Sequence, residues 1–239
     1  MGISERISSI FRRTEENTPT RKLRYLSVTD IFCDLGQEEL MEIAHAATMV
    51  TCQAGKMLYS PEERGEVLFI LKKGHVQIYR MSDGGRKLVM VTLGPGTVFG
   101  EMALTGTEMH DAFAEATEDA LICILNRRDV EKLLMSKPQV AVRLLDVIGK
   151  RLKETEERLE QTLFNDVPTR LAALLVRLRA DSGRDVIDMT HEQLSEHLGV
   201  YRETITGALN NLRKENLIAI GRKQVQLIDV AGLQRRASG

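Results

Sequence analysis

Turn-forming residues recur about every ten positions between Gly55 and Gly106, and this spacing is the strongest constraint on the fold. Short apolar runs that suit β-strands lie between and beyond them, at 67–71, 76–81, 88–93 and 121–125. Asp83-Gly84 separates two of these runs and is a hairpin signal, because such a dipeptide tolerates the positive φ angles of a tight turn. We therefore expect a roll of about eight antiparallel strands in two sheets, which leaves few open edges.

The hydrophobic period changes from that of a strand to that of a helix after Pro138. Apolar residues then alternate at spacings of three and four, with charged residues on the flanks. This heptad pattern predicts a helix whose narrow apolar stripe pairs with a second copy, giving a parallel homodimer. The alternative is a helix that packs on its own roll. The predicted seam consists of Leu145, Ile148, Leu152 and Leu159.

A break follows the long helix at residues 165–168, Asn-Asp-Val-Pro. Asp166 can cap a new helix that has Pro168 in its first turn, where proline is tolerated. We place a domain boundary and hinge at Asp166. The expected parts are a flexible segment 1–22, a β-roll 23–136 with a short amphipathic helix at 35–47, a dimerisation helix 137–165 and a C-terminal domain 166–239.

The C-terminal domain carries a helix-turn-helix pattern. Thr190 and Gln193 form a capping box that starts the first helix. The small Ser195 lets a second helix approach, and Gly199 permits the sharp turn between the helices. The positions expected to be buried are apolar: Leu194, Leu198, Val200, Ile205 and Ala208. This pattern is typical of domains whose second helix enters the major groove of DNA.

The exposed face of the second helix is polar. Arginine can bond guanine with two hydrogen bonds, and glutamate can accept one from cytosine, so this face suits a half-site that contains G·C pairs. The candidate DNA-contacting residues are Tyr201, Arg202, Glu203, Thr206 and Asn210, together with Thr190.

Two strand-like runs, 217–220 and 225–228, predict a wing after the second helix. Arg222 and Lys223 in the turn between them are expected to contact phosphates regardless of sequence. From Pro168 onward there are 11 Lys and Arg residues against eight Asp and Glu, whereas the rest of the chain is acidic. This asymmetry agrees with a nucleic-acid partner.

Residues 98–104, Val-Phe-Gly-Glu-Met-Ala-Leu, and 201–205, Tyr-Arg-Glu-Thr-Ile, resemble motifs of the cyclic-AMP receptor protein/FNR (CRP/FNR) family of bacterial transcription regulators. The resemblance covers nearly the whole chain. It implies an α+β protein: an N-terminal double-stranded β-helix, or jelly roll, like that of cyclic-nucleotide-binding domains, then a long dimerisation helix and a C-terminal winged helix-turn-helix domain.

The resemblance also implies a function. It predicts a homodimer that regulates transcription by binding a palindromic operator in double-stranded DNA, with RNA polymerase as a further partner. Arg202, Glu203 and Thr206 would read the bases. Gly207 stands where many relatives have another arginine, so the preferred half-site is expected to differ.

We expect DNA binding to be controlled by an effector, and the sequence indicates that this effector is not cyclic AMP. In cyclic-AMP-binding relatives, the pair matching Gly100-Glu101 lies on the phosphate-binding turn, and an Arg-Ser pair clamps the phosphate. Here His110 and Asp111 match that pair, and like charges about 4 Å apart repel by on the order of 1 to 4 kcal/mol. We expect an allosteric effector of unknown identity. Its candidate pocket comprises Gly100, Glu101, Met102, His110, Asp111 and Thr155.

Two alternatives stay open. The roll could be a scaffold in an effector-independent regulator, or the chain could be a metal-dependent enzyme like the cupins, although His75, His110 and Glu101 lack the cupin spacing. The cysteines Cys33, Cys52 and Cys123 lack the clustering of an iron–sulfur site. We therefore predict no enzymatic activity, catalytic residue, metal or cofactor. The apolar runs are too short to span a bilayer and residues 1–14 are too polar for a signal peptide, so we expect a cytoplasmic protein without a membrane partner.

Overall fold

The computed structural model describes residues 12–13, 18–61, 67–100 and 112–237. They form two compact units. The first takes the described residues within 1–81 and 90–150, and the second takes those within 82–89 and 151–239.

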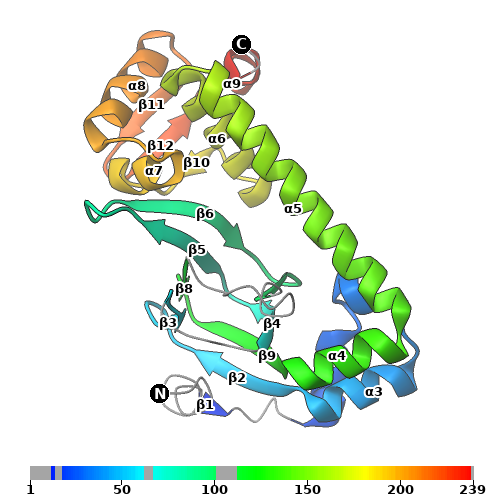
Figure 1. Ribbon diagram of the computed structural model, residues 1–239. Helices are drawn as coiled ribbons and strands as arrows, with labels where there is room; N and C mark the ends of the chain where they lie inside the picture. Colours follow the sequence, from blue (N-terminus) through cyan, green and yellow to red (C-terminus); the bar gives the residue numbers. More distant parts are fainter. Residues whose placement is uncertain (1–11, 14–17, 62–66, 101–111, 238–239) are drawn as a thin grey trace. The chain divides into compact units, whose positions relative to one another are not determined.

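The first unit is built on antiparallel strands, one of which begins in residues 87–89 of the second unit (Figure 1). They are β1 (Arg12–Arg13), β2 (Thr48–Cys52), β3 (Met57–Tyr59), β4 (Val67–Lys73), β5 (Val76–Met81), β6 (Lys87–Leu93), β7 (Val98–Phe99), β8 (Phe113–Ala116) and β9 (Ala120–Asn126). One sheet has the order β1-β2-β9-β4-β7 and the other has the order β3-β8-β5-β6. The predicted two-sheet roll is thus confirmed.

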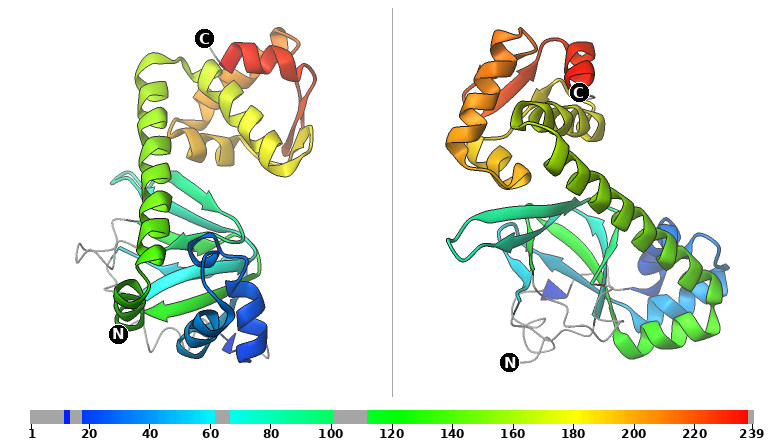
Figure 2. Two further views of the ribbon diagram at one scale, coloured as in Figure 1. Left: turned by 90° about the vertical axis from the view of Figure 1, so that its right-hand side faces the viewer. Right: turned by 45° about the horizontal axis from the view of Figure 1, so that its top comes forward.

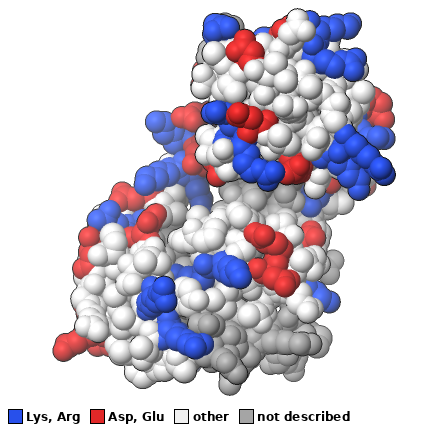
Figure 3. All heavy atoms as spheres, turned by 180° about the vertical axis from the view of Figure 1, so that it is seen from behind, with Lys and Arg blue, Asp and Glu red and all other residues white. Residues whose placement is uncertain are grey.

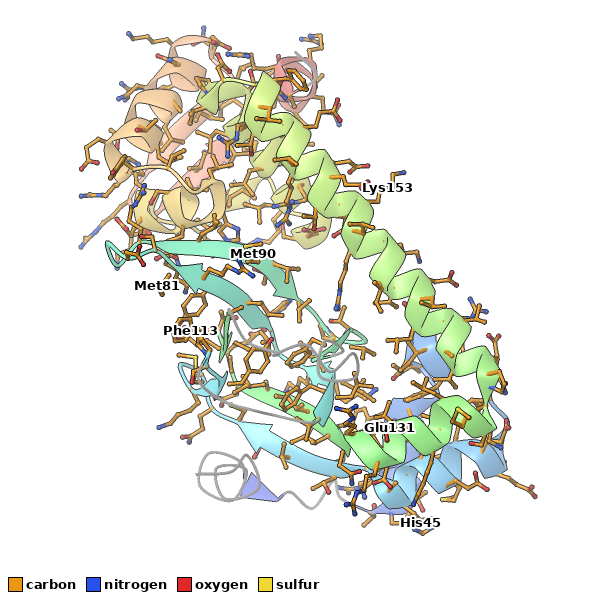
Figure 4. The ribbon with its side chains drawn as sticks, in the orientation of Figure 1. His45, Met81, Met90, Phe113, Glu131 and Lys153 are labelled. Carbon is orange, nitrogen blue, oxygen red and sulfur yellow. The ribbon has the colours of Figure 1, made fainter. Side chains whose placement is uncertain are left out.

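The predicted hairpin turn lies between β5 and β6, which are neighbours in their sheet. The Ser82 N–H donates to the Arg86 carbonyl across it at 2.9 Å. Gly85 takes the positive φ of 73°. On the same sheet, Phe113 of β8 (labelled in Figure 4) stacks on Tyr79 of β5, with ring centroids 5.2 Å apart.

The central strands β4 and β9 are buried on both faces. One face lines the interior between the two sheets, where the rings of Phe69 and Phe99 stack with centroids 4.9 Å apart. The other face packs against helices. These are α2 (Pro19–Leu26), α3 (Gln37–Ala46) and α4 (Arg127–Ser136), with the short 3-10 helix η2 (Asp30–Phe32). The helix predicted at 35–47 is α3, whereas α2 and α4 were not predicted.

Two buried lysines attach α2 to the rest of the first unit. Lys22 donates through Nζ to the Ala44 carbonyl of α3 at 2.9 Å and to the carbonyl of Ala47, the residue after this helix, at 2.5 Å. Lys72 donates to the Tyr25 carbonyl of α2 at 2.9 Å and to the Thr29 hydroxyl. Carbonyls without helical partners gather at helix C-termini, so these bonds offset part of the cost of burying the two cations. Burial lowers the pKa of Lys72 to about 8.

The long helix predicted at 137–165 is α5 (Pro138–Phe164), which runs unbroken for 27 residues. Val140 and Leu144 near its start are buried. Arg143 donates through Nε to the carboxylate of Asp34 at 2.6 Å.

The second unit contains α6 (Val167–Ser182), α7 (His191–Leu198), α8 (Arg202–Lys214) and α9 (Val230–Ala237). Its sheet has the order β10-β12-β11, from β10 (Val186–Ile187), β11 (Ile218–Gly221) and β12 (Gln224–Leu227). The wing hairpin and the helix capped by Asp166 were predicted, whereas the edge strand β10 and the helix α9, which packs on α6 (Figure 2), were not.

The start of α6 is fixed by a network around Asp166. Its carboxylate accepts the Thr169 N–H at 2.9 Å, as the sequence predicted for a helix cap. Arg236 of α9 donates to the same carboxylate at 3.1 Å. Bonds from the Thr169 hydroxyl and N–H, and then the charge of Arg236, hold the pKa of Asp166 below its usual range. The two ends of the domain sequence are therefore joined at this point.

Candidate functional site

The helix α7 is held by local capping at both ends. The Thr190 hydroxyl accepts the Gln193 N–H at 3.2 Å, and the Gln193 side chain accepts the Thr190 N–H at 2.8 Å. Gly199 ends the helix with φ 68° and donates its N–H to the Ser195 carbonyl at 2.9 Å. A residue with a Cβ is disfavoured in this left-handed conformation. The predicted capping box and glycine turn are confirmed.

Packing fixes α8 against α7. Leu194 of α7 and Ile205 and Leu209 of α8 are fully buried in one core. Ser195 is 4% exposed, and its hydroxyl donates to the Glu192 carbonyl of its own helix at 2.7 Å. A small side chain whose polar group is already bonded lets two helices approach closely without an unpaired buried donor. The predicted helix-turn-helix is therefore a rigid pair.

The far end of α7 is attached to α6. Arg170 donates to the Leu198 carbonyl at 2.7 Å and so pairs one of the last carbonyls of α7. Burial, and then the charge of Arg177, lower the pKa of His197 to about 4. This imidazole is consequently neutral at neutral pH and adds no positive charge to the site.

The structure brings the predicted DNA-contacting residues of α8 together on one face. Tyr201, Arg202 and Glu203 are exposed at its start, and Thr206 and Asn210 are half-buried along it. The side chains near the N-terminus of a recognition helix are those that reach base edges in known complexes.

His191, the first residue of α7, also lies at this face, although the sequence reasoning did not select it. Its Nδ1 lies 3.0 Å from the Thr206 hydroxyl oxygen of α8. Its position directly after the capping residue Thr190, at the start of α7, could have marked it as a residue of this face. The sequence alone could not show which residue of α8 it would meet.

The wing carries the other predicted contacts. Arg222 and Lys223 form the exposed two-residue turn between β11 and β12, since Gly221 pairs with Gln224. Lys223 takes a positive φ of 58°. Figure 3 shows groups of Lys and Arg side chains on the surface of this unit. Exposed cations of this kind suit phosphate contacts that carry no sequence information.

The predicted seam on α5 is exposed in the single chain. Leu145 is 66% exposed, and Leu152 and Leu159 are each 59% exposed. Ile148 is 37% exposed. Charged side chains flank the stripe, such as Lys153 (labelled in Figure 4), whose Nζ lies 3.9 Å from the Glu157 carboxylate. An apolar stripe with charged flanks is the pattern that pairs two helices.

The predicted effector pocket is described only in part. Gly100 follows β7 with φ 85°. Thr155 is exposed on α5, and its hydroxyl donates to the Arg151 carbonyl one turn earlier at 2.8 Å. Glu101, Met102, His110 and Asp111 lie outside the described residues.

The described residues also bear on metal binding and membrane insertion. They contain no group of three or more His, Cys, Asp or Glu side chains arranged to hold a metal ion. Likewise, none of their helices combines the length and apolar character needed to cross a membrane.

Comparisons with known proteins match both units. Residues 49–137 match the family described as cyclic nucleotide-binding domain, and residues 169–236 match the Crp-like helix-turn-helix domain. The chain is 30% identical to the cyclic AMP receptor protein of Thermus thermophilus over 185 residues, which are 77% of this chain and 86% of the relative.

Solved structures share the fold. A transcriptional regulator of the CRP/FNR family, also from Thermus thermophilus, is 27% identical, with a TM-score of 0.70 over 80% of this chain and 98% of its own. A crp/fnr family protein from Eubacterium rectale, 19% identical, superposes with a TM-score of 0.77 over 89% of this chain and all of its own. The second likeness concerns the fold alone.

Proposed function

Because the chain belongs to the CRP/FNR family of transcription regulators and carries the family's helix-turn-helix DNA-binding domain, we propose that it reads a palindromic operator through the exposed face of α8. The observation that carries this proposal is the polar face of Arg202, Glu203 and Thr206 on a helix held rigidly against a capped α7. Rigid presentation matters, since base readout requires hydrogen bonds of defined geometry.

Each side chain has a chemical role in this proposal. Arg202 donates two hydrogen bonds to guanine, and Glu203 accepts one from the cytosine amino group. Thr206 and Asn210 contact further bases. Tyr201, Thr190, Arg222 and Lys223 contact the backbone, where they set the position of the domain without reading sequence.

The functional unit is a homodimer joined along α5. The occupant of the exposed stripe is a second copy, because the stripe repeats at heptad spacing and its flanks are charged. Two helix-turn-helix domains would then enter successive major grooves about 34 Å apart on one side of the duplex. Such a dimer would act on promoter DNA in the cytoplasm, with RNA polymerase as its further partner.

In this proposal, an effector other than cyclic AMP controls DNA binding. The support is the sequence: His110 and Asp111 replace the Arg-Ser pair that holds the cyclic phosphate in cyclic-AMP-binding relatives. Effector binding would shift the population between two dimer geometries that differ by rotation about Asp166. An effector-independent regulator would instead bind its operator fully without additions.

The experiment that tests the proposed function is a selection of bound duplexes from random DNA, with and without cell extract, followed by affinity measurements. On the selected operator, Arg202→Ala is expected to weaken binding by about 1 to 3 kcal/mol, with much less change on bulk DNA. Arg184→Ala is the matched control, because Arg184 is an exposed arginine of the same unit paired with Asp188. Equal losses on operator and bulk DNA, or no selected sequence, would contradict the proposal.

A further inference from the structure

The contact between α7 and α8 contains one hydroxyl with two polar neighbours. The oxygen of the Thr206 side chain lies 3.0 Å from the carbonyl of Arg202, one turn earlier on α8. It also lies 3.0 Å from Nδ1 of His191. Both distances are those of ordinary hydrogen bonds.

The direction of both bonds follows from the number of protons. A threonine hydroxyl has a single proton, and a carbonyl oxygen can only accept. The contact with Arg202 is therefore a bond that the hydroxyl donates, a common arrangement for threonine inside a helix. His191 must then be the donor to the hydroxyl oxygen, so its imidazole carries a proton on Nδ1.

The position of His191 is set before DNA binds. It is the first residue of α7, next to the capping box of Thr190 and Gln193. Its helix packs on α8 through a fully buried core that includes Leu194 and Ile205. The imidazole is half-buried between the helices, so its donor group is directed by packing rather than by solvent.

We propose that His191 is a positioning residue that makes Thr206 a hydrogen-bond acceptor toward DNA and thereby determines the base it faces. The hydroxyl proton is used inside α8 and one lone pair receives His191, which leaves one lone pair for a base. An acceptor pairs with the amino groups of adenine N6 or cytosine N4. It has no proton for guanine O6 and N7 or thymine O4. This inference rests on the proposed base-reading role of Thr206.

The first test uses substitutions that separate the two ring nitrogens. His191→Asn keeps an N–H donor near the place of Nδ1, whereas His191→Gln places its amide near the place of Nε2. At the base pair facing Thr206, the wild type and His191→Asn are expected to prefer adenine or cytosine. In His191→Gln that preference should fall by roughly threefold to tenfold, the worth of one neutral hydrogen bond.

A second pair of variants identifies the partner. Thr206→Val removes the hydroxyl at nearly constant shape and should lose the same preference. Adding His191→Gln to Thr206→Val should cause no further loss, because the two residues act through one bond. His45→Gln on α3 is the matched control, since this exposed histidine lies in the first unit and the same substitution there should leave the preference unchanged.

A spectroscopic measurement on the intact protein tests the inference without DNA. Nitrogen-15 NMR of the histidine rings, assigned by comparison with His191→Asn, should show the His191 proton on Nδ1. A proton on Nε2 alone in the neutral ring would overturn the inference, as would a wild-type base preference that survives His191→Gln. A wild type with no base preference at any position would instead refute the proposed function, and the inference with it.

Discussion

The buried amine of Lys72 makes a specific prediction about stability and pH. Its side chain is 9% exposed, and burial lowers its pKa from 10.5 to about 8. Between these two values the unfolded chain binds a proton at Lys72 that the folded chain does not. Stability therefore rises with pH across this window, and the folded protein carries the full cost of the charge below about pH 8.

The magnitude follows from the same pKa values. A pKa lowered from 10.5 to about 8 corresponds to about 3 kcal/mol in the free energy of unfolding. Between about pH 7 and about pH 9.5, the free energy of unfolding should rise by about 2 kcal/mol as Lys72 of the folded protein loses its proton. Lys72→Met lacks the titrating group. The free energy of unfolding of the wild type minus that of the variant should therefore rise by that amount from about pH 7 to about pH 9.5.

Urea unfolding followed by tyrosine fluorescence measures this difference. The chain has no tryptophan, and three of its four tyrosines, Tyr25, Tyr59 and Tyr79, lie in the first unit, as Lys72 does. Burial raises the pKa of the Cys52 and Cys123 thiols to about 11, and their titration opposes that of Lys72. Both proteins should therefore carry Cys52→Ala and Cys123→Ala. Stability curves that run parallel from about pH 7 to about pH 9.5 would refute the reasoning.

Two further predictions concern the dimer and the effector. Leu152→Glu places a charge in the proposed seam and removes a leucine from each copy. The dissociation constant of the dimer should therefore rise at least about 100-fold. Lys153→Glu, on the flank of the stripe, should change this constant little. Sedimentation velocity over a dilution series measures this, and a Leu152→Glu protein that stays dimeric would exclude the α5 seam. Calorimetric titration with cyclic AMP should show no saturable binding. Stoichiometric binding would contradict the inference that His110 and Asp111 cannot hold a cyclic phosphate.

The helix-turn-helix could be predicted in detail because its determinants are local. The capping box of Thr190 and Gln193 spans four residues, and the turn depends on the conformational freedom of Gly199 alone. The strand runs were recognisable for a related reason, since turn residues separate them at short, regular intervals. In both cases the information lies within about ten residues of the element that it specifies.

Other elements depend on partners that are distant in the sequence. Strand β10 has only two residues and exists through its pairing with β12, 38 to 40 residues later. Helix α9 was missed because it is short, and its place on α6 depends on Arg236, which bonds to Asp166 70 residues earlier. Sequence patterns report on residues that are close together in the chain, so they do not predict contacts between such distant pairs.

The sequence by itself determined the elements that have a regular local pattern, the face of α8 that meets solvent and the apolar stripe of α5, since each follows from the period of hydrophobic residues and from local capping. Only the tertiary structure decided that Lys22 and Lys72 are buried against helix ends and that His191 meets Thr206. A polar side chain is placed inside a protein by the bonding partners that packing brings to it, and those partners have no periodic signature in the chain.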